Sequence, residues 1–142
     1  MKRLWLIVYV FIPSLVVAGD QQYGDIQITD VTSIYDADTF RVNIASWPEI
    51  IGKRVPVRVQ GIDAPEIRGK CETEKKMARQ AKQFTVAALR NGKEIVLHDI
   101  QRGKYFRILA RVSIDGQDLG RQLIQAGLAR AYDGGTRQGW CH

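Results

Sequence analysis

Residues 39–59, TFRVNIASWPEIIGKRVPVRV, contain two strand-like runs on either side of a turn-rich loop. In Thr39–Ile44 the apolar and polar side chains alternate, as they do in a strand with one buried face. Val55–Val59 returns to this alternation, and its second residue, Pro56, predicts an edge strand or a first strand position. Ser46–Arg54 lies between the two runs and holds a proline and a glycine. The stretch therefore predicts a β-hairpin.

Three further segments of the chain are interpreted as strands. Ile26–Tyr35 partly alternates apolar and polar residues just before the hairpin, and the polar turn Asp36–Asp38 separates the two. Lys93–Ile100 and Tyr105–Ile114 lie nearer the C-terminus and are also strand-like. The sequence thus predicts three strands in its first half and two in its second.

Two segments have the period of a helix instead. Between Cys71 and Asn91 the apolar residues fall on one face, opposite lysines and arginines. The residues of this face are Met77, Ala81, Phe84, Ala88 and Leu89. Asn91-Gly92 predicts the end of this helix, with a left-handed cap. Asp118 can cap a second, short helix that Gly127 closes.

The order of these elements indicates the fold class. Five strands and a crossing helix are the content of a small Greek-key barrel of the OB type. We therefore expect a mainly β protein with helices, a five-stranded OB-fold barrel with one long and one short helix. Residues 19–142 are expected to form one domain.

The N-terminus predicts a signal peptide over residues 1–18. A positive start is followed by an apolar run, Leu4–Val17, and by small residues that favour cleavage after Ala18. The run is shorter than the roughly 20 residues of a spanning helix, and the alternative is an uncleaved anchor. We expect an exported protein, periplasmic or secreted, that is monomeric and not stably bound to a membrane after cleavage.

Charge and cysteine content add two weaker indications. The 21 lysines and arginines against 15 acidic residues give a modest bias towards polyanions such as nucleic acid. The two cysteines, Cys71 and Cys141, are an even number in an oxidising compartment, which predicts a disulfide. The alternative is a pair of free or intermolecular thiols.

Three polar segments next to predicted strands hold the groups needed to cut a phosphodiester. They are Asp36–Thr39, Arg58–Glu66 and Lys104–Arg107. Aspartates could hold a hard cation, a further carboxylate could activate water, and two arginines could clamp a phosphate. The residue types suit Mg²⁺ as well as Ca²⁺, and the sequence has no Cys/His cluster that would suggest zinc. Each segment alone could also be a polar turn, a helix cap or a solvated strand.

In order and spacing, these motifs resemble those of the staphylococcal nuclease (thermonuclease) family. The matching motifs are Asp-x-Asp-Thr, Arg-x₄-Asp-x-Pro-Glu and Lys-Tyr-x-Arg, and the likeness extends from about Ile26 to Tyr132. The resemblance implies a Ca²⁺-dependent endonuclease that acts on DNA and RNA and leaves 3′-phosphates.

The resemblance also implies a role for each residue of the site. Asp38 and Asp63 would ligate Ca²⁺ directly, with the backbone carbonyl of Ala64, and Asp36 would act through water. Glu66 would be the general base, and Arg58 and Arg107 would bind phosphate. Lys104, Tyr105 and Tyr132 would bind substrate. Phe106 departs from the family pattern, and the Cys71–Cys141 bridge is expected to tie the tail to the main helix in place of the family's C-terminal helix.

Two other functions agree with the same fold. The first is a noncatalytic OB-fold module that binds nucleic acid or protein, and the second is a calcium-stabilised interaction domain. The first would not need the full set of site residues, and the second would leave Arg58, Arg107 and Glu66 without a role. Outside this set, His98 is expected to be a surface or hydrogen-bonded histidine. Trp47 and Trp140 are expected to pack.

Overall fold

The computed structural model describes residues 23–141. The predicted signal peptide and its cleavage point lie outside these residues. Over the described part of the chain, no helix combines the length and the apolar character needed to cross a membrane.

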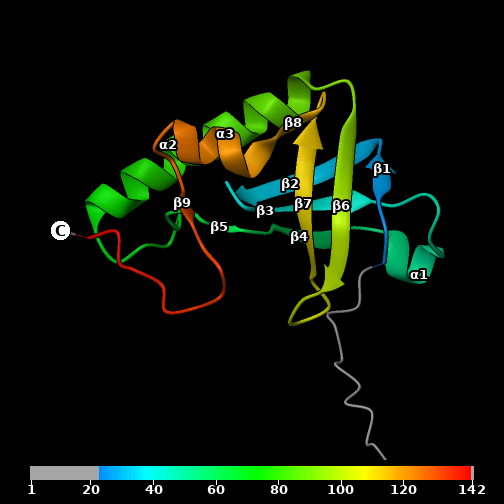
Figure 1. Ribbon diagram of the computed structural model, residues 1–142, viewed down its shortest axis with the longest axis horizontal. Coiled ribbons are helices and arrows are strands. Elements are labelled where there is room, and N and C mark those ends of the chain that lie inside the picture. Colours follow the sequence, from blue (N-terminus) through cyan, green and yellow to red (C-terminus); the bar gives the residue numbers. More distant parts are fainter. Residues whose placement is uncertain (1–22, 142) are drawn as a thin grey trace, which may run out of the picture.

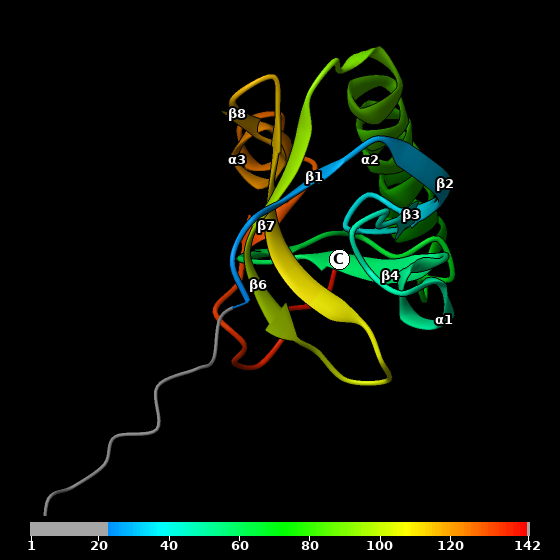
Figure 2. The ribbon, with the colours of Figure 1, turned by 90° about the vertical axis from the view of Figure 1, so that its right-hand side faces the viewer.

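Seven of the strands form one strongly curled sheet (Figures 1 and 2). Its strand order is β1-β6-β7-β4-β3-β2, and β8 pairs with β7. β1 and β2 are separated only by Thr29, so the two ends of this order belong to one stretch of chain and the sheet closes on itself. The bounds are β1 Ile26–Ile28, β2 Asp30–Asp36, β3 Thr39–Asn43, β4 Val55–Val59, β6 Ile95–Arg102, β7 Ile108–Ile114 and β8 Gln117–Asp118.

The predicted fold class, a β-barrel with helices, is confirmed. The five predicted strands correspond to the β1–β2 stretch, β3, β4, β6 and β7. The interior of the barrel is filled by fully buried side chains that alternate along the strands, as the sequence pattern predicts. They include Phe40, Val42, Val57, Val59, Leu97 and Val112.

Helices cover one end of the barrel (Figure 1). The long helix α2, Glu72–Asn91, packs against β2, and the short helix α3, Leu119–Gln125, packs against β7 and α2. Both were predicted. The sequence did not predict α1, Glu49–Gly52, a single turn inside the loop between β3 and β4.

A second, two-stranded sheet brings the C-terminal segment back to the barrel. β5, Ile62–Asp63, pairs antiparallel with β9, Arg130–Ala131. Tyr132 continues this contact, since its N–H donates to the carbonyl of Gly61 at 3.0 Å. The residues after β9 therefore begin beside Asp63, which is why the tail can reach the polar end of the barrel.

The buried face of α2 differs from the predicted one. Its buried residues are Glu74, Ala78, Ala81, Thr85 and Leu89. Met77, Phe84 and Ala88 are half-buried at the flank of this stripe. The sequence pattern missed Glu74 and Thr85 because polar residues on a charged helix are ordinarily assigned to solvent. Both have hydrogen-bond partners in the backbone, described below.

Two predictions about backbone are wrong. Pro56 lies in a central strand, because β4 pairs with β3 on one side and β7 on the other. The pairing with β7 begins only at Val57, so the missing N–H of Pro56 interrupts no bond in that ladder. Gly92 ends α2 with φ −67° rather than in a left-handed cap. A glycine is needed there because a Cβ atom would lie 2.3 Å from the Cγ2 atom of Ile114.

The third polar motif does not open a strand as predicted. β6 extends to Arg102 and β7 begins at Ile108, so Lys104–Arg107 form the connecting loop of this hairpin. Tyr105 and Phe106 both take left-handed backbone angles, with φ of 57° and 58°. The tight turn leaves Tyr105 and Phe106 strongly exposed, at 90% and 81%.

Candidate functional site

Two nearly buried aspartates and one arginine form the centre of the site. Asp38 follows β2 and Asp63 ends β5, and their side chains are 4% and 5% exposed. Arg58 projects from β4 between them. Its Nη1 atom lies 3.1 Å from Asp38 Oδ2, and its Nη2 atom lies 3.9 Å from Asp63 Oδ1. The structure thus joins the first two sequence motifs at one end of the barrel.

The acidic turn Asp36–Asp38 is held by the long helix. Thr85, fully buried in α2, donates its hydroxyl to the carbonyl oxygen of Ala37 at 2.8 Å. Asp36 accepts the N–H of Ile67 at 3.3 Å. Asp38 accepts the hydroxyl of its neighbour Thr39 at 2.9 Å. These bonds orient the carboxylates of both motifs towards each other.

Burial raises the pKa of two of these carboxyl groups. For Asp38 the main cause is removal from water; the charge of Arg58 partly opposes it, and the nearby charge of Asp63 adds to it. For Asp36 burial is again the main cause, opposed by the hydrogen bond from Ile67. Burial thus disfavours the charged form of both carboxyl groups.

The residue types at this end of the barrel suit a hard cation, although among residues 23–141 the three aspartates do not bring their ligand oxygens within 4.8 Å of one another. Asp36, Asp38 and Asp63 offer only carboxylate oxygens, which are the ligands that Ca²⁺ and Mg²⁺ prefer. A divalent cation would also relieve the cost of burying Asp36 and Asp38 in their charged forms. Ala64 is buried and directly follows Asp63.

Glu66 lies at the rim of the site, on a loop that Glu74 shapes. The N–H of Glu66 and the N–H of Lys70 donate to the two carboxylate oxygens of Glu74, at 3.4 Å and 3.0 Å. Glu74 was not identified from the sequence. A signal was present, because it is the third residue after Cys71, the N-cap of α2, and this spacing is that of a capping box.

A second arginine, Arg137, also binds the acidic residues and was likewise missed. Its Nε atom donates to Asp63 Oδ1 at 2.6 Å, its Nη2 atom pairs with the same oxygen, and its Nη1 atom donates to Glu66 Oε1 at 2.7 Å. Burial opposes its charge, but Asp63 and Glu66 outweigh this and raise the pKa of Arg137. Arg137 is a lone cation in an irregular tail, so no local pattern marked it.

Trp140 completes the contacts of Asp63. It is buried, as expected for a packing residue, and its Nε1 atom donates to Asp63 Oδ2 at 3.3 Å. Arg130 lies over its ring at 3.7 Å from the centroid. Both oxygens of Asp63 therefore have partners from the tail.

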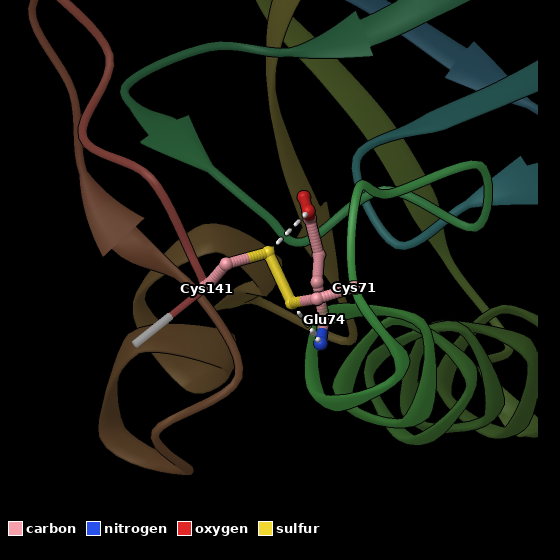
Figure 3. Close-up of side chains that lie close together, drawn as sticks. All are labelled: Cys71, Glu74 and Cys141. Carbon is pink, nitrogen blue, oxygen red and sulfur yellow. Dashed lines mark hydrogen bonds between the residues drawn. A yellow bond between two sulfur atoms is a disulfide. The ribbon is translucent and has the colours of Figure 1, made fainter.

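The predicted disulfide between Cys71 and Cys141 is confirmed (Figure 3). Cys71 caps α2, so the bridge fastens the tail to the N-terminus of this helix, as expected. The Sγ atom of Cys141 lies 3.7 Å from a carboxylate oxygen of Glu74. Because the two sulfur atoms are bonded to each other, neither cysteine offers a thiolate to a metal. The group of Cys71, Glu74 and Cys141 is therefore not a metal site.

The structure does not bring the third motif into contact with the acidic residues. Arg107 precedes β7 and lines a separate pocket with Trp47, Ile51 and Phe106. Leu109 in β7 is the register partner of Arg58 in β4, so Arg107 lies two residues before the partner of Arg58. Within the described residues, the Nε atom of Arg107 is buried without a hydrogen-bond partner. The rest of its side chain is half-buried at the edge of this pocket.

The remaining predicted site residues lie at the periphery. Lys104 and Tyr105 are on the exposed hairpin loop. Tyr132 lines a cavity beside Asp63, and its hydroxyl donates to the carbonyl of Gly135 at 2.8 Å. His98 is satisfied as expected, between Asp25 at 2.8 Å and Ser113 at 2.7 Å.

Comparisons with known proteins agree on one family. The family model described as "Staphylococcal nuclease homologue" matches residues 56–139, more than half of the chain. "Probable endonuclease lcl3" of Pyrenophora tritici-repentis is 27% identical over 128 residues, covering 75% of this chain and 47% of that protein. "Probable endonuclease LCL3" of Pyricularia oryzae is 28% identical over 129 residues, covering 72% and 48%. The chain thus spans about half the length of these relatives.

Proposed function

The chain belongs to the family of staphylococcal nuclease homologues, and from this premise we propose that it is a secreted, Ca²⁺-dependent endonuclease. It would hydrolyse phosphodiester bonds of DNA and RNA and leave 3′-phosphates. The observation that carries the proposal is the cluster of Asp38, Asp63, Arg58 and Glu66 at one end of the barrel. The names of the relatives, which are those of endonucleases, support it.

We assign the cation site to Asp36, Asp38, Asp63 and the carbonyl of Ala64. When bound, Ca²⁺ would supply Lewis-acid polarisation of a phosphate oxygen. Glu66 is half-exposed at the rim, where its carboxylate can accept a proton from an attacking water. Its contact with Arg137 has to open for that role.

We assign phosphate binding to Arg58 and Arg107. Planar guanidinium groups donate in pairs to phosphate oxygens, and their attraction grows as negative charge builds in the transition state. The position of Arg107 supports this assignment, because it lies two residues before Leu109, the register partner of Arg58 in the neighbouring strand. Lys104, Tyr105 and Tyr132 would hold more distant parts of the substrate.

The first test compares degradation of supercoiled DNA, single-stranded DNA and RNA by the purified protein, with Ca²⁺ and with chelator. We expect cleavage only with Ca²⁺ and its loss in Glu66→Ala. The matched control is Glu49→Ala, which removes an exposed glutamate paired only with Lys53, and it should cleave normally. A polynucleotide kinase should label the products without prior dephosphorylation, because a 3′-phosphate product carries a 5′-hydroxyl.

Arg107→Ala provides a second test. It should lower turnover by about 10²–10³, the usual loss for one transition-state donor. Unchanged turnover would remove Arg107 from the mechanism. Intact DNA and RNA under every condition, in folded protein, would favour the noncatalytic binding module instead.

We also propose export, with a signal peptide cleaved after Ala18. The Cys71–Cys141 disulfide supports this, since such bonds persist in oxidising compartments. N-terminal sequencing of the exported protein should begin at Gly19, and a sequence that begins at Met1 would contradict the cleavage. Size-exclusion chromatography should show the expected monomer.

A further inference from the structure

The C-terminal segment 133–141, here called the tail, places a cation among the residues assigned to cation binding. Three nitrogen atoms of Arg137 contact Asp63 and Glu66, as described above. The contact to Asp63 is the more buried one, because Asp63 is 5% exposed and Glu66 is 49% exposed. Of the two carboxylates that Arg137 contacts, Asp63 is therefore the buried one.

The same carboxylate oxygen cannot serve Arg137 and a divalent cation at full strength. Asp63 Oδ1 accepts from Arg137 Nε and also faces Arg58, and Oδ2 accepts from Trp140. Charge-assisted hydrogen bonds of this kind are the stronger ones in proteins. A cation that ligates Asp63 Oδ1 competes with the Arg137 contacts at that oxygen, and at either oxygen it meets the positive charge of Arg137.

The tail is held in place by contacts that do not involve the acidic cluster. The Cys71–Cys141 disulfide fixes the C-terminal end, and Arg130 fixes the two residues before it by donating to the carbonyl of Gly139 at 3.0 Å and stacking on Trp140. Arg137 lies between these anchors and β9. The guanidinium of Arg137 therefore has the high effective concentration at Asp63 of a group on a short tether.

We propose that Arg137 is a tethered competitor of the divalent cation at Asp63 and that the Cys71–Cys141 disulfide sets the strength of the competition. The inference rests on the cation site assigned above. The tail then lowers the affinity of the site for the cation. Removal of Arg137, or release of the tail by reduction of the disulfide, strengthens binding of the cation.

The test is calorimetric titration of the purified protein with Ca²⁺ in the absence of nucleic acid. Arg137→Gln should bind Ca²⁺ roughly tenfold to a hundredfold more tightly than the unaltered protein, the range spanned by loss of charge-assisted hydrogen bonds. Arg137→Lys should lie between them, because lysine keeps the charge but cannot bridge two carboxylates with a planar fork.

Arg68→Gln is the matched control. Arg68 lines the same cavity as Arg137, Asp63 and Glu66 and is exposed, and within residues 23–141 it has no ion pair with them. The substitution removes the same charge from the same surface. Calcium affinity should change much less than in Arg137→Gln.

A second measurement follows the displaced side chain directly. In the nuclear magnetic resonance spectrum, the Nε–H signal of Arg137 should be protected without Ca²⁺ and lost or strongly shifted when Ca²⁺ is added. If Arg137 weakens binding of Ca²⁺ at Asp63, then bound Ca²⁺ must weaken the contact of Arg137 with Asp63 by the same factor. An unchanged Nε–H signal at saturating Ca²⁺ would overturn the proposal.

The role of the disulfide is tested with a double-mutant cycle. Cys71→Ser with Cys141→Ser should raise calcium affinity in the unaltered background and have no further effect in the Arg137→Gln background. Thermal unfolding must first show that each variant is folded. Equal gains in both backgrounds would mean that the bridge acts independently of Arg137.

The remaining outcomes separate this inference from the proposed function. Equal or weaker calcium binding in Arg137→Gln, with nuclease activity intact, overturns only the competition. Binding of Ca²⁺ by neither protein overturns the competition and the assigned calcium site together. Cleavage of nucleic acid would then have to proceed with another ion.

Discussion

Arg58 is the residue on which the stability of the acidic end of the barrel depends most directly. It is 18% exposed and pairs with Asp38, which is 4% exposed. A buried carboxylate that loses its only close cation keeps the full cost of its desolvation. The same side chain thus has a structural effect that is separable from its assigned contact with phosphate.

Arg58→Ala should lower the free energy of unfolding in chelator by about 3 kcal/mol, the loss expected when one partner of a buried pair is removed. Denaturant unfolding with and without Ca²⁺ measures it, and Ca²⁺ should reduce the loss. Arg111→Ala is the control, since its pair with Asp99 is about half exposed and is worth at most about 1 kcal/mol. Equal losses in the two variants would contradict the account.

Thr85→Val tests the bond that fixes the acidic turn to α2. Valine keeps the shape of threonine but leaves the buried carbonyl of Ala37 without its donor. The free energy of unfolding should fall by about 1–3 kcal/mol. Thr32→Val removes a longer, exposed bond to Arg41 and should change it by no more than about 0.5 kcal/mol.

At the scale of elements, His98 joins three strands. It projects from β6, contacts Ser113 in β7, and pairs with Asp25, which directly precedes β1. This contact lies at the start of β1, the strand that closes the barrel by pairing with β6. The closure therefore depends in part on a titratable pair.

The pKa of Asp25 is lowered, chiefly by its hydrogen bond with His98 and then by the N–H of Asp99. A carboxyl group with a lowered pKa contributes stability that is present above its unfolded pKa, about 3.9, and is lost as pH falls through the folded value. We expect His98→Ala to return the pKa of Asp25 towards its ordinary value in a magnetic resonance titration. Asp25→Asn in the unaltered background serves as the control, because it identifies the signal that belongs to Asp25.

At the scale of the whole molecule, the disulfide links residues that are 70 positions apart. A loop of this length restricts the unfolded chain strongly, which the chain-entropy account values at about 4 kcal/mol. The bridge closes the chain around α2, the barrel strands β6 and β7, and α3. Its effect on stability is therefore global.

Cys71→Ser with Cys141→Ser should lower the midpoint of thermal unfolding by many degrees, as a loss of about 4 kcal/mol implies for a domain of this size. Calorimetry of the two forms in chelator measures it. Added reductant should destabilise the unaltered protein in the same way and leave the variant unaffected. A reductant effect on the variant would mean that the agent acts elsewhere.

Sequence patterns predicted most of the fold because they report burial. Alternation along β3 and β4 and the period of α2 follow directly from which side chains leave water. The patterns failed where burial and polarity disagree. Glu74 and Thr85 are buried polar residues with partners, and Pro56 lies in a central strand that pairs with β7 only after it.

The candidate site was predicted for residues in motifs and missed for residues outside them. Asp38, Asp63 and Arg58 do meet, because each follows or lies in a strand whose neighbours the topology fixes. Arg137 has no periodic or spacing signal, since irregular segments are positioned by their anchors rather than by their own sequence. Tyr105 was assigned to the start of a strand and Lys104 to the position just before it, and both lie on an exposed turn instead.

The sequence by itself determined the barrel, its two main helices, the pairing of its two cysteines and the carboxylates that gather at one end. These follow from local periodicity and from motif residues placed at strand ends. Only the tertiary structure decided that the tail returns to this end and sets Arg137 against Asp63 and Glu66. The physical reason is that a long-range ion pair depends on where two distant backbones are anchored, and β5–β9 pairing and the disulfide supply those anchors.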